Sequence, residues 1–309
     1  HAIDRILAGV RPFRSVSAVV FECRLGASSD VDVSFCLTDE DVRRGAFEPD
    51  GPFDPRWARV RAWLDAWAAP GSPDRPWVEV VGLELDRLGE DPTVPLPSIF
   101  WQTARDDSED PRWLFDAVEA VSGDPVPPRL RRAVASAARA LPAGRFVSHF
   151  ALMLPRADRS LRMVVPRLPL ASAFDYLAAI GWPGELCRLR RELAVVADRV
   201  ESVALAFGLG PEPLPGLGFE CYLPGTDRAA WEDLLAVLVR RGLSTPEKPA
   251  ALLEWPGTSD GFHRSLTHVK LVWHPQRGVE AKAYFDIQEP VIPLAAAGAA
   301  MNDERLIGS

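Results

Sequence analysis

The chain alternates between two hydrophobic patterns. Short stretches in which apolar and polar residues alternate one by one predict strands, because successive strand side chains point to opposite faces. These stretches come in pairs separated by turn-forming residues, which predicts antiparallel hairpins. Between the pairs, apolar residues recur every three or four positions, as on one face of a helix. The five predicted hairpins are Ser17–Thr38, Trp77–Thr103, Arg145–Pro166, Ser202–Leu223 and Thr267–Ile287.

Start and stop residues sharpen the prediction of the helices. The clearest helix begins after the capping residues Thr226 and Asp227 and stops at Gly242. By contrast, the prolines within Gly210–Gly216 predict a stiff loop rather than a strand. The predicted helices are Pro55–Ala69, Asp110–Val121, Pro128–Leu141, Ala171–Ile180, Pro183–Val200 and Thr226–Arg241.

One helix carries a stripe of tryptophans. Trp57, Trp63 and Trp67 recur at helical spacing within Pro55–Ala69. Such a stripe can line a ligand site, but it is more often the face with which a helix packs on the core. We therefore predict a core role.

The connections between strands indicate the fold class. Most strand pairs are joined by segments too short for a parallel crossover, so the sheet is predicted to be antiparallel. Ten antiparallel strands either split into two sheets or close on themselves. Because helices are regularly interposed, we predict an α/β fold: a closed ten-stranded antiparallel barrel of five hairpins, surrounded by helices in αββα repeats. A single domain is predicted over residues 1–290, followed by a tail (291–309) whose composition is typical of a disordered segment or a short helix.

Composition narrows the classes of partner. The 309 residues carry a net charge of −8 without a basic stripe, which argues against nucleic acid. There is no apolar run of the ~18 residues that a membrane helix needs, so no membrane partner is expected. The four cysteines lack CxxC spacing and the histidines do not cluster, which predicts no metal site and a reducing, cytoplasmic location. The acidic run Asp106–Asp110 precedes a predicted helix, where acids complement the helix dipole, so it is assigned a structural role.

The predicted strands also concentrate rare polar residues. The chain has three lysines and three tyrosines, yet Lys270, Lys282, Tyr222 and Tyr284 all fall in predicted strands. In each strand the apolar set is expected to contact the helices. The polar set then faces a lumen or, if the sheet is open, bulk water. We favour the lumen, because all five hairpins have this pattern.

A lumen of this composition has a definite chemistry. Converging cations and phenols bind a diphosphate, and phenol rings flank a carbocation without attacking it. A carboxylate such as Glu22, Glu84 or Glu220 accepts the proton released when an acceptor is alkylated. The alternative for each charged residue is an ordinary surface ion pair.

These features resemble the αββα-barrel aromatic prenyltransferases, most closely the short peptide-modifying type of cyanobactin pathways. The resemblance lies in the five hairpins and in three short motifs, Cys23-Arg24-Leu25, Ser160-Leu161-Arg162-Met163 and Glu220-Cys221-Tyr222. It implies transfer of a prenyl group from an isoprenoid diphosphate, dimethylallyl or longer, to an aromatic small molecule or a peptide side chain. In that family no protein metal cage is required, and Mg²⁺ dependence varies.

The resemblance also implies roles for single residues. Arg24, Arg162 and Lys282 would hold phosphate oxygens, and Glu22 would be the catalytic base. Tyr222 and Tyr284 would shield the allyl cation. The expected substrate-binding residues are Arg24, Arg162, Lys270, Lys282, Tyr222, Tyr284, Glu220 and His268.

Two other classes of function compete with prenyl transfer. The same barrel could serve as a non-catalytic accessory protein that binds a peptide or a small molecule. Hydrolysis is disfavoured, since the sequence contains no Gly-x-Ser-x-Gly elbow, P-loop, GxGxxG or HExxH motif. The face on which Lys282 and Tyr284 lie separates a lumenal site from a scaffold.

Overall fold

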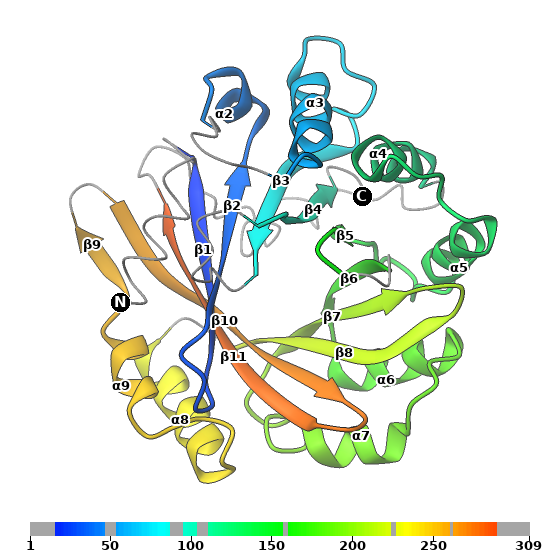
Figure 1. Cartoon of the computed structure of the whole chain (residues 1–309). Helices are drawn as coiled ribbons and strands as arrows, with labels where there is room; N and C mark the ends of the chain where they lie inside the picture. Colours follow the sequence, from blue (N-terminus) through cyan, green and yellow to red (C-terminus); the bar gives the residue numbers. More distant parts are fainter. Residues whose placement is uncertain are drawn as a thin grey trace, which may run out of the picture.

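A ring of ten antiparallel strands forms the centre of the computed structural model (Figure 1). Each strand pairs with the next along the ring, and β11 pairs with both β1 and β10, which closes it. An additional strand, β9 (Gly257–Ser259), lies on the first part of β10. The structure describes residues 16–46, 54–86, 95–103, 111–156, 160–223, 227–259 and 262–288. The ring consists of β1 (Ala18–Arg24), β2 (Val31–Leu37), β3 (Val78–Leu85), β4 (Ser98–Thr103), β5 (His149–Met153), β6 (Leu161–Leu168), β7 (Ser202–Leu209), β8 (Pro213–Tyr222), β10 (Phe262–His274) and β11 (Gly278–Gln288).

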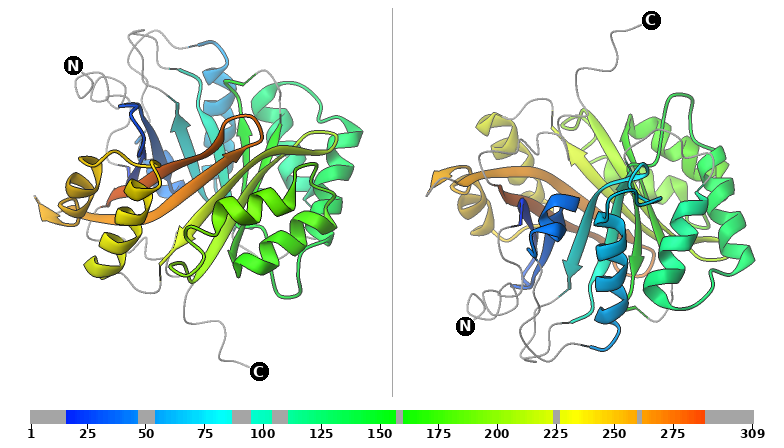
Figure 2. Two further views of the ribbon diagram at one scale, coloured as in Figure 1. Left: turned by 90° about the horizontal axis from the view of Figure 1, so that it is seen from below. Right: turned by 90° about the horizontal axis from the view of Figure 1, so that it is seen from above.

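Helices surround the ring on its outside, as the two further views in Figure 2 show. The main hydrophobic core lies between the helices and the outward strand side chains. A second, small apolar group, Val164, Ala204 and Ala206 with Tyr222 against it, is separate from that core because it lies on the opposite strand face. The described helices are α2 (Asp39–Arg43), α3 (Trp57–Ala68), α4 (Arg112–Ser122), α5 (Pro128–Arg139), α6 (Leu170–Ala179), α7 (Leu186–Leu193), α8 (Arg228–Arg240) and α9 (Lys248–Leu253).

The predicted closed barrel and its five hairpins are confirmed by the strand pairing. Local signals predicted the ends of elements well. Asp227 caps α8 by accepting from the Ala230 amide at 2.7 Å. Gly242 after that helix and Gly278 in the last hairpin have φ of 69° and 76°, the left-handed region that favours glycine.

The predicted proline loop at Gly210–Gly216 is wrong in its second half. Pro213 already belongs to β8 and lies opposite Leu209 of β7. The pairing of β8 with β10 begins only at Leu217. Prolines are therefore tolerated here, because this part of the strand has a free edge that needs no N–H donor.

Three short elements were not predicted: α2, α9 and β9. Each is too short to produce a periodic pattern. Helix α2 is held instead by a capping box, in which Thr38 and Asp41 bond each other's backbone amides. The predicted helix Pro183–Val200 is also shortened, to the eight residues of α7.

A clamp fixes the turn between β1 and β2 to the helical layer. Lys248, at the start of α9, donates to the backbone carbonyl oxygens of Arg24, Gly26 and Ser28. The Thr245 amide donates to the Leu25 carbonyl oxygen in the same turn. The end of β1 is therefore held in position from outside the ring.

Several predictions fall outside the described residues, namely the acidic run Asp106–Asp110, the end of the domain at 290 and the tail 291–309. Among the helices that the structure describes, there is none with the length and apolar character to cross a membrane.

Candidate functional site

Lys282 and Tyr284 lie on the inner face of the ring. Their neighbours in the strand, Ala281 and Ala283, belong to the main core beneath the helices, so the alternating residues point inward. The inner face thus carries the polar set that the sequence predicted. Several of its members are nearly buried: Glu22 and Glu84 retain 8% exposure and Lys270 retains 7%.

Three cations lie side by side on three neighbouring strands. Strand register places Arg24 of β1 opposite Lys282 of β11, and Lys282 opposite Lys270 of β10. We call these three residues the cation row. Like charges directly opposite each other on a sheet are destabilising, so the row must be compensated.

Carboxylates compensate every member of the cation row. Lys282 forms an ion pair and a hydrogen bond with Glu22, and Lys270 lies 3.1 Å from Glu220 Oε1. The guanidinium of Arg24 lies 3.3 Å from both Asp32 and Glu280, while its Nη1 is buried without a hydrogen bond to any residue that the structure describes.

These pairs keep the carboxylates ionised despite burial. Burial alone would raise the pKa of Glu220, but Lys270 and His268 outweigh it and lower the pKa to about 2. At Glu22, burial acts to raise the pKa, whereas Lys282 and Lys270 act to lower it. The two lysines outweigh burial, so the pKa of Glu22 is lowered. Glu22 is therefore an ionised partner of Lys282 and a weak base while that pair is intact.

Aromatic side chains lie beside the cation row. The His268 ring stacks on Tyr284, with ring centroids 4.4 Å apart, and is tilted against Tyr222 at 5.5 Å. We call these three residues the aromatic row. Lys270 Nζ lies 5.4 Å from the Tyr284 ring centroid and 3.5 Å from its hydroxyl, and the Tyr222 hydroxyl donates to Glu220 at 3.4 Å. The two rows are thus one connected cluster.

A bulge in β10 sets the inward direction of His268. The register between β10 and β11 shifts between Leu266 and His268, and such bulges re-aim the side chains that follow. Burial lowers the pKa of His268 to about 4, so its imidazole is neutral at pH 7. Its Nε2 is buried without a hydrogen bond to any described residue and lies 3.9 Å from Glu220 Oε2.

Gly218 of β8 provides the space for Lys270. A Cβ atom at Gly218 would lie 2.6 Å from Lys270 Cε. We expect Gly218→Ala to displace this flexible chain and its ammonium from Glu220, with less than about 1 kcal/mol change in the free energy of unfolding. Binding of an anion at the cation row should weaken. Gly216→Ala on the same strand is the matched control, because its nearest neighbour is the Trp273 carbonyl oxygen at 4.0 Å. Equal anion affinity in both variants would contradict this role.

Arg162 is not part of this cluster. It lies on β6, opposite Ala151 and Gly208, and makes no hydrogen bond or ion pair with any residue that the structure describes. The charge that it influences is Glu84 on β3. The remaining predicted site residues, Glu22, Arg24, Glu220, Tyr222, His268, Lys270, Lys282 and Tyr284, do come together.

Glu84 has an unusual electrostatic environment. Burial, with the nearby carboxylates of Glu22 and Asp86, raises its pKa to about 8, although Arg162 and Lys270 act in the opposite direction. The folded state then holds a proton that the unfolded state releases above pH ~4.5. Stability should therefore fall as the pH rises from about 5 to 8, by at most about 1.4 kcal/mol per pH unit for this group.

Urea denaturation of the wild type and Glu84→Gln between pH 5 and pH 8 measures this effect. The glutamine variant cannot ionise and should lose less stability across the range. The free energy of unfolding of the wild type should therefore fall relative to that of the variant as the pH rises. Parallel profiles would show that Glu84 titrates normally.

The sequence did not assign partners to the cations. Asp32 and Glu280 hold Arg24, and Gly218 makes room for Lys270, but no local motif marks any of the three. Their positions depend on which strands meet when the ring closes. The sequence showed only that these three residues alternate with apolar residues, which places them on the inner face.

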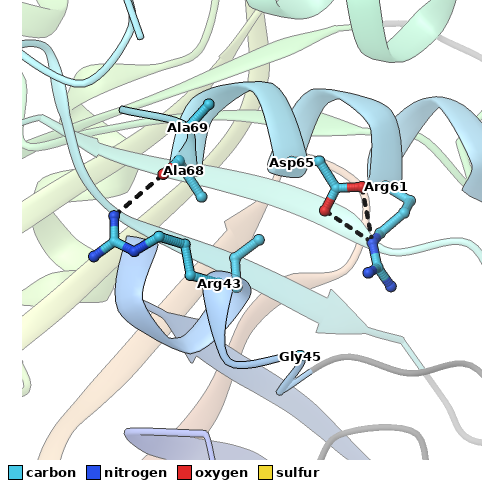
Figure 3. Close-up of a pocket in the computed structure, with 7 residues that line it drawn as sticks. Arg43, Gly45, Arg61, Asp65, Ala68 and Ala69 are labelled. Carbon is cyan, nitrogen blue, oxygen red and sulfur yellow. Dashed lines mark hydrogen bonds and ion pairs between the residues drawn. The ribbon is translucent and has the colours of Figure 1, made fainter. Parts of the chain in front are cut away.

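A surface pocket lies between α2 and α3 (Figure 3). It is lined by Val42, Arg43, Gly45, Arg61, Asp65, Ala68 and Ala69. Arg43 donates to the Ala68 carbonyl oxygen at 3.2 Å and Arg61 to Asp65 at 3.0 Å. Both arginines are engaged by the protein, so the pocket offers less chemistry than the barrel interior.

Within the described ranges, no three His, Cys, Asp or Glu side chains are grouped so as to hold a metal ion. The carboxylates beside the cation row each contact a cation.

The fold and this cluster define the class of the protein as a closed antiparallel barrel with helices outside and a charged, aromatic interior. No family model matches the chain, and a search of curated proteins gave no match. Among solved structures, the chain is similar to the crystal structure of AnaPT from Neosartorya fischeri, with a TM-score of 0.48 and 13% identity over 93% of this chain and 85% of that chain. The assignment of the barrel stands on the strand pairing of this chain itself.

Proposed function

We propose that the protein transfers a prenyl group from an isoprenoid diphosphate, dimethylallyl or longer, to an aromatic or peptide side-chain nucleophile inside the barrel. The resemblance noted in the sequence adds peptide natural product biosynthesis of the cyanobactin type as the proposed setting. The acceptor would be an aromatic small molecule or a peptide.

The cation row carries this proposal. Three cations held next to one another on three strands bring together several donors that a bound polyanion could contact at once. Charge-assisted hydrogen bonds from Lys and Arg are the usual means of holding phosphate oxygens. The buried Nη1 of Arg24 has no hydrogen-bond partner among the described residues, so it is a donor available for such an oxygen.

The aromatic row extends the same argument to the prenyl group. With the diphosphate on the cation row, the allyl carbons would lie against Tyr284 and Tyr222. The π faces of these rings stabilise a developing carbocation. The Tyr222 hydroxyl stays protonated, and so is a poor nucleophile, because burial raises its pKa well above its ordinary value.

A change of partner would give Glu22 its catalytic role. In the free protein Lys282 neutralises this carboxylate. A diphosphate that draws Lys282 away would leave Glu22 as a less compensated carboxylate, which is a stronger base. Glu22 would then accept the proton that the alkylated acceptor releases.

The test is a calorimetric titration of the wild-type chain with dimethylallyl S-thiolodiphosphate, a donor analogue that resists cleavage, with and without Mg²⁺. Saturable binding is expected, together with weakening by about 1.5–3 kcal/mol in Lys282→Met/Glu22→Gln, the range for a hydrogen bond to a charged group. Adding Arg162→Ala to this variant tests whether Arg162, which lies apart from the cation row, also contributes. Absence of saturable binding to this and to longer-chain analogues would overturn the proposal.

A non-catalytic role has one observation in its favour. Every member of the cation row already has a carboxylate within reach, so the interior is close to neutral without any ligand. A barrel that binds a peptide or a small molecule needs no more than this. Binding of an uncharged ligand without diphosphate binding would favour that role.

A further inference from the structure

A second group of polar side chains faces the barrel interior away from the cation row. Strand register places Glu84 of β3 between Ser34 of β2 and Ser98 of β4. Residues opposite each other on neighbouring strands have Cβ atoms about 4.5–5.5 Å apart. The three side chains therefore form one short row across three strands.

The side chains of this row make no hydrogen bond among the residues that the structure describes. Ser98 is fully buried, and its hydroxyl has no partner in that part of the chain. Glu84, with 8% exposure, makes no hydrogen bond or ion pair with any described residue. Buried polar groups in proteins are nearly always paired, so unpaired neighbours of this kind call for an external partner. The residual exposure of Glu84 means that a water-sized space reaches it.

The aromatic ring of Phe100 lies next to this row of three side chains. Phe100 of β4 lies between Gly82 of β3 and Ala151 of β5, which face the same side of the sheet. A Cβ atom at Gly82 would lie 3.3 Å from Phe100 Cβ. Phe100 is only partly buried, so part of its side chain stays open to the barrel interior. Stacked aromatic pairs are favourable, which makes this ring a candidate packing surface for a ligand ring.

We propose that Glu84, Ser98 and Ser34 form a recognition subsite for an uncharged, flat acceptor that carries a hydrogen-bond donor beside an acceptor, as in a lactam or an amide. The ring of that molecule would pack on Phe100. The subsite serves the acceptor of the prenyl transfer, and to this extent it rests on the proposed function.

The protonation of Glu84 explains the preference for such a ligand. Its raised pKa leaves the carboxyl largely neutral at pH 7, with an O–H donor and a carbonyl acceptor side by side. A lactam or amide edge presents the reciprocal pair. An anionic acceptor would face the carboxylates of Glu22 and Asp86, and a cationic one would face Arg162 and Lys270.

The experiment measures the affinity of three probes for the full chain in the absence of any diphosphate. Oxindole has a donor beside an acceptor, N-methyloxindole has the acceptor alone, and indole has the donor alone. We expect saturable binding of oxindole, and at least about tenfold weaker binding of the other two, which corresponds to roughly 1.4 kcal/mol.

Variants locate the binding. Glu84→Gln keeps a neutral donor and acceptor and should stay within about threefold of the wild type, whereas Glu84→Leu should weaken oxindole at least about tenfold and Ser98→Ala about threefold to tenfold. Ser244→Ala, which removes a buried hydroxyl that donates to Thr245 outside the ring, is the control and should have no effect. Failure of oxindole to bind, or equal affinity in Glu84→Leu and the wild type, would overturn the subsite.

The same titrations separate this inference from the proposed function. Oxindole binding that persists while the thiolodiphosphate fails to bind would remove prenyl transfer and leave the subsite in place. Thiolodiphosphate binding without oxindole binding would remove the subsite and leave the proposed prenyl transfer in place.

Discussion

Replacing both lysine–glutamate pairs of the barrel interior by neutral pairs is expected to weaken diphosphate binding by about 3–6 kcal/mol. The two changes are Lys282→Met with Glu22→Gln, and Lys270→Met with Glu220→Gln. Each lysine supplies one charge-assisted contact worth about 1.5–3 kcal/mol. Together they correspond to roughly 10²–10⁴-fold in the dissociation constant, with some departure from additivity because the two lysines are neighbours.

Changing both partners of each ion pair avoids a loss of stability that would obscure the binding measurement. Removing a lysine alone would leave Glu22 or Glu220 buried and uncompensated, which is strongly destabilising, whereas neutral replacement of a whole buried pair is often harmless. Titration with dimethylallyl S-thiolodiphosphate measures the loss. Arg199→Met with Asp233→Asn, an exposed pair 2.7 Å apart, is the matched control. Unchanged affinity in the fourfold variant would rule out the cation row as the phosphate site.

Trp67→Ala is expected to lower the free energy of unfolding by about 3–5 kcal/mol, the range for a large aromatic side chain removed from a core. Trp67 is fully buried, and its indole N–H donates to the Val78 carbonyl oxygen at 3.2 Å. It also stacks on Trp63 with ring centroids 6.1 Å apart. The cavity and the lost hydrogen bond act together.

Urea denaturation measures this effect, with Arg61→Ala on the exposed side of the same helix as a control that should change stability by about 0.5 kcal/mol or less. The result also tests the function of the tryptophan stripe. If Trp67→Ala kept its stability and changed ligand binding instead, the stripe would be a ligand site rather than core.

The sequence predicted the ring but not its closure in detail. Alternation with a period of two sorted each strand into an inner and an outer set, and Gly278 with its positive φ fixed the last hairpin. Which strands meet is a different matter, because Glu22 and Lys282 are 260 positions apart and no local pattern connects them. The bulge before His268 also has no signature in the sequence.

Because local patterns do not show which strands meet, the sequence predicted the residues of the site better than their arrangement. Arg24, Lys270 and Lys282 were expected to act on one ligand, and they are neighbours because β11 lies between β1 and β10. Arg162 was expected with them, but β6 lies on another part of the ring. Glu84 was noted as one candidate base among three. Its position between Ser34 and Ser98 follows from the pairing of three strands, which no local pattern shows.

The most direct test of this account is a crystal structure of the protein with dimethylallyl S-thiolodiphosphate bound. We predict phosphate oxygens within hydrogen-bonding distance of Lys270, Lys282 and Arg24 Nη1, with the prenyl chain against Tyr284 and Tyr222. Lys282 should have moved from Glu22 toward the diphosphate. A diphosphate bound outside the ring, or an interior in which both lysine–glutamate pairs persist beside the bound molecule, would contradict the account.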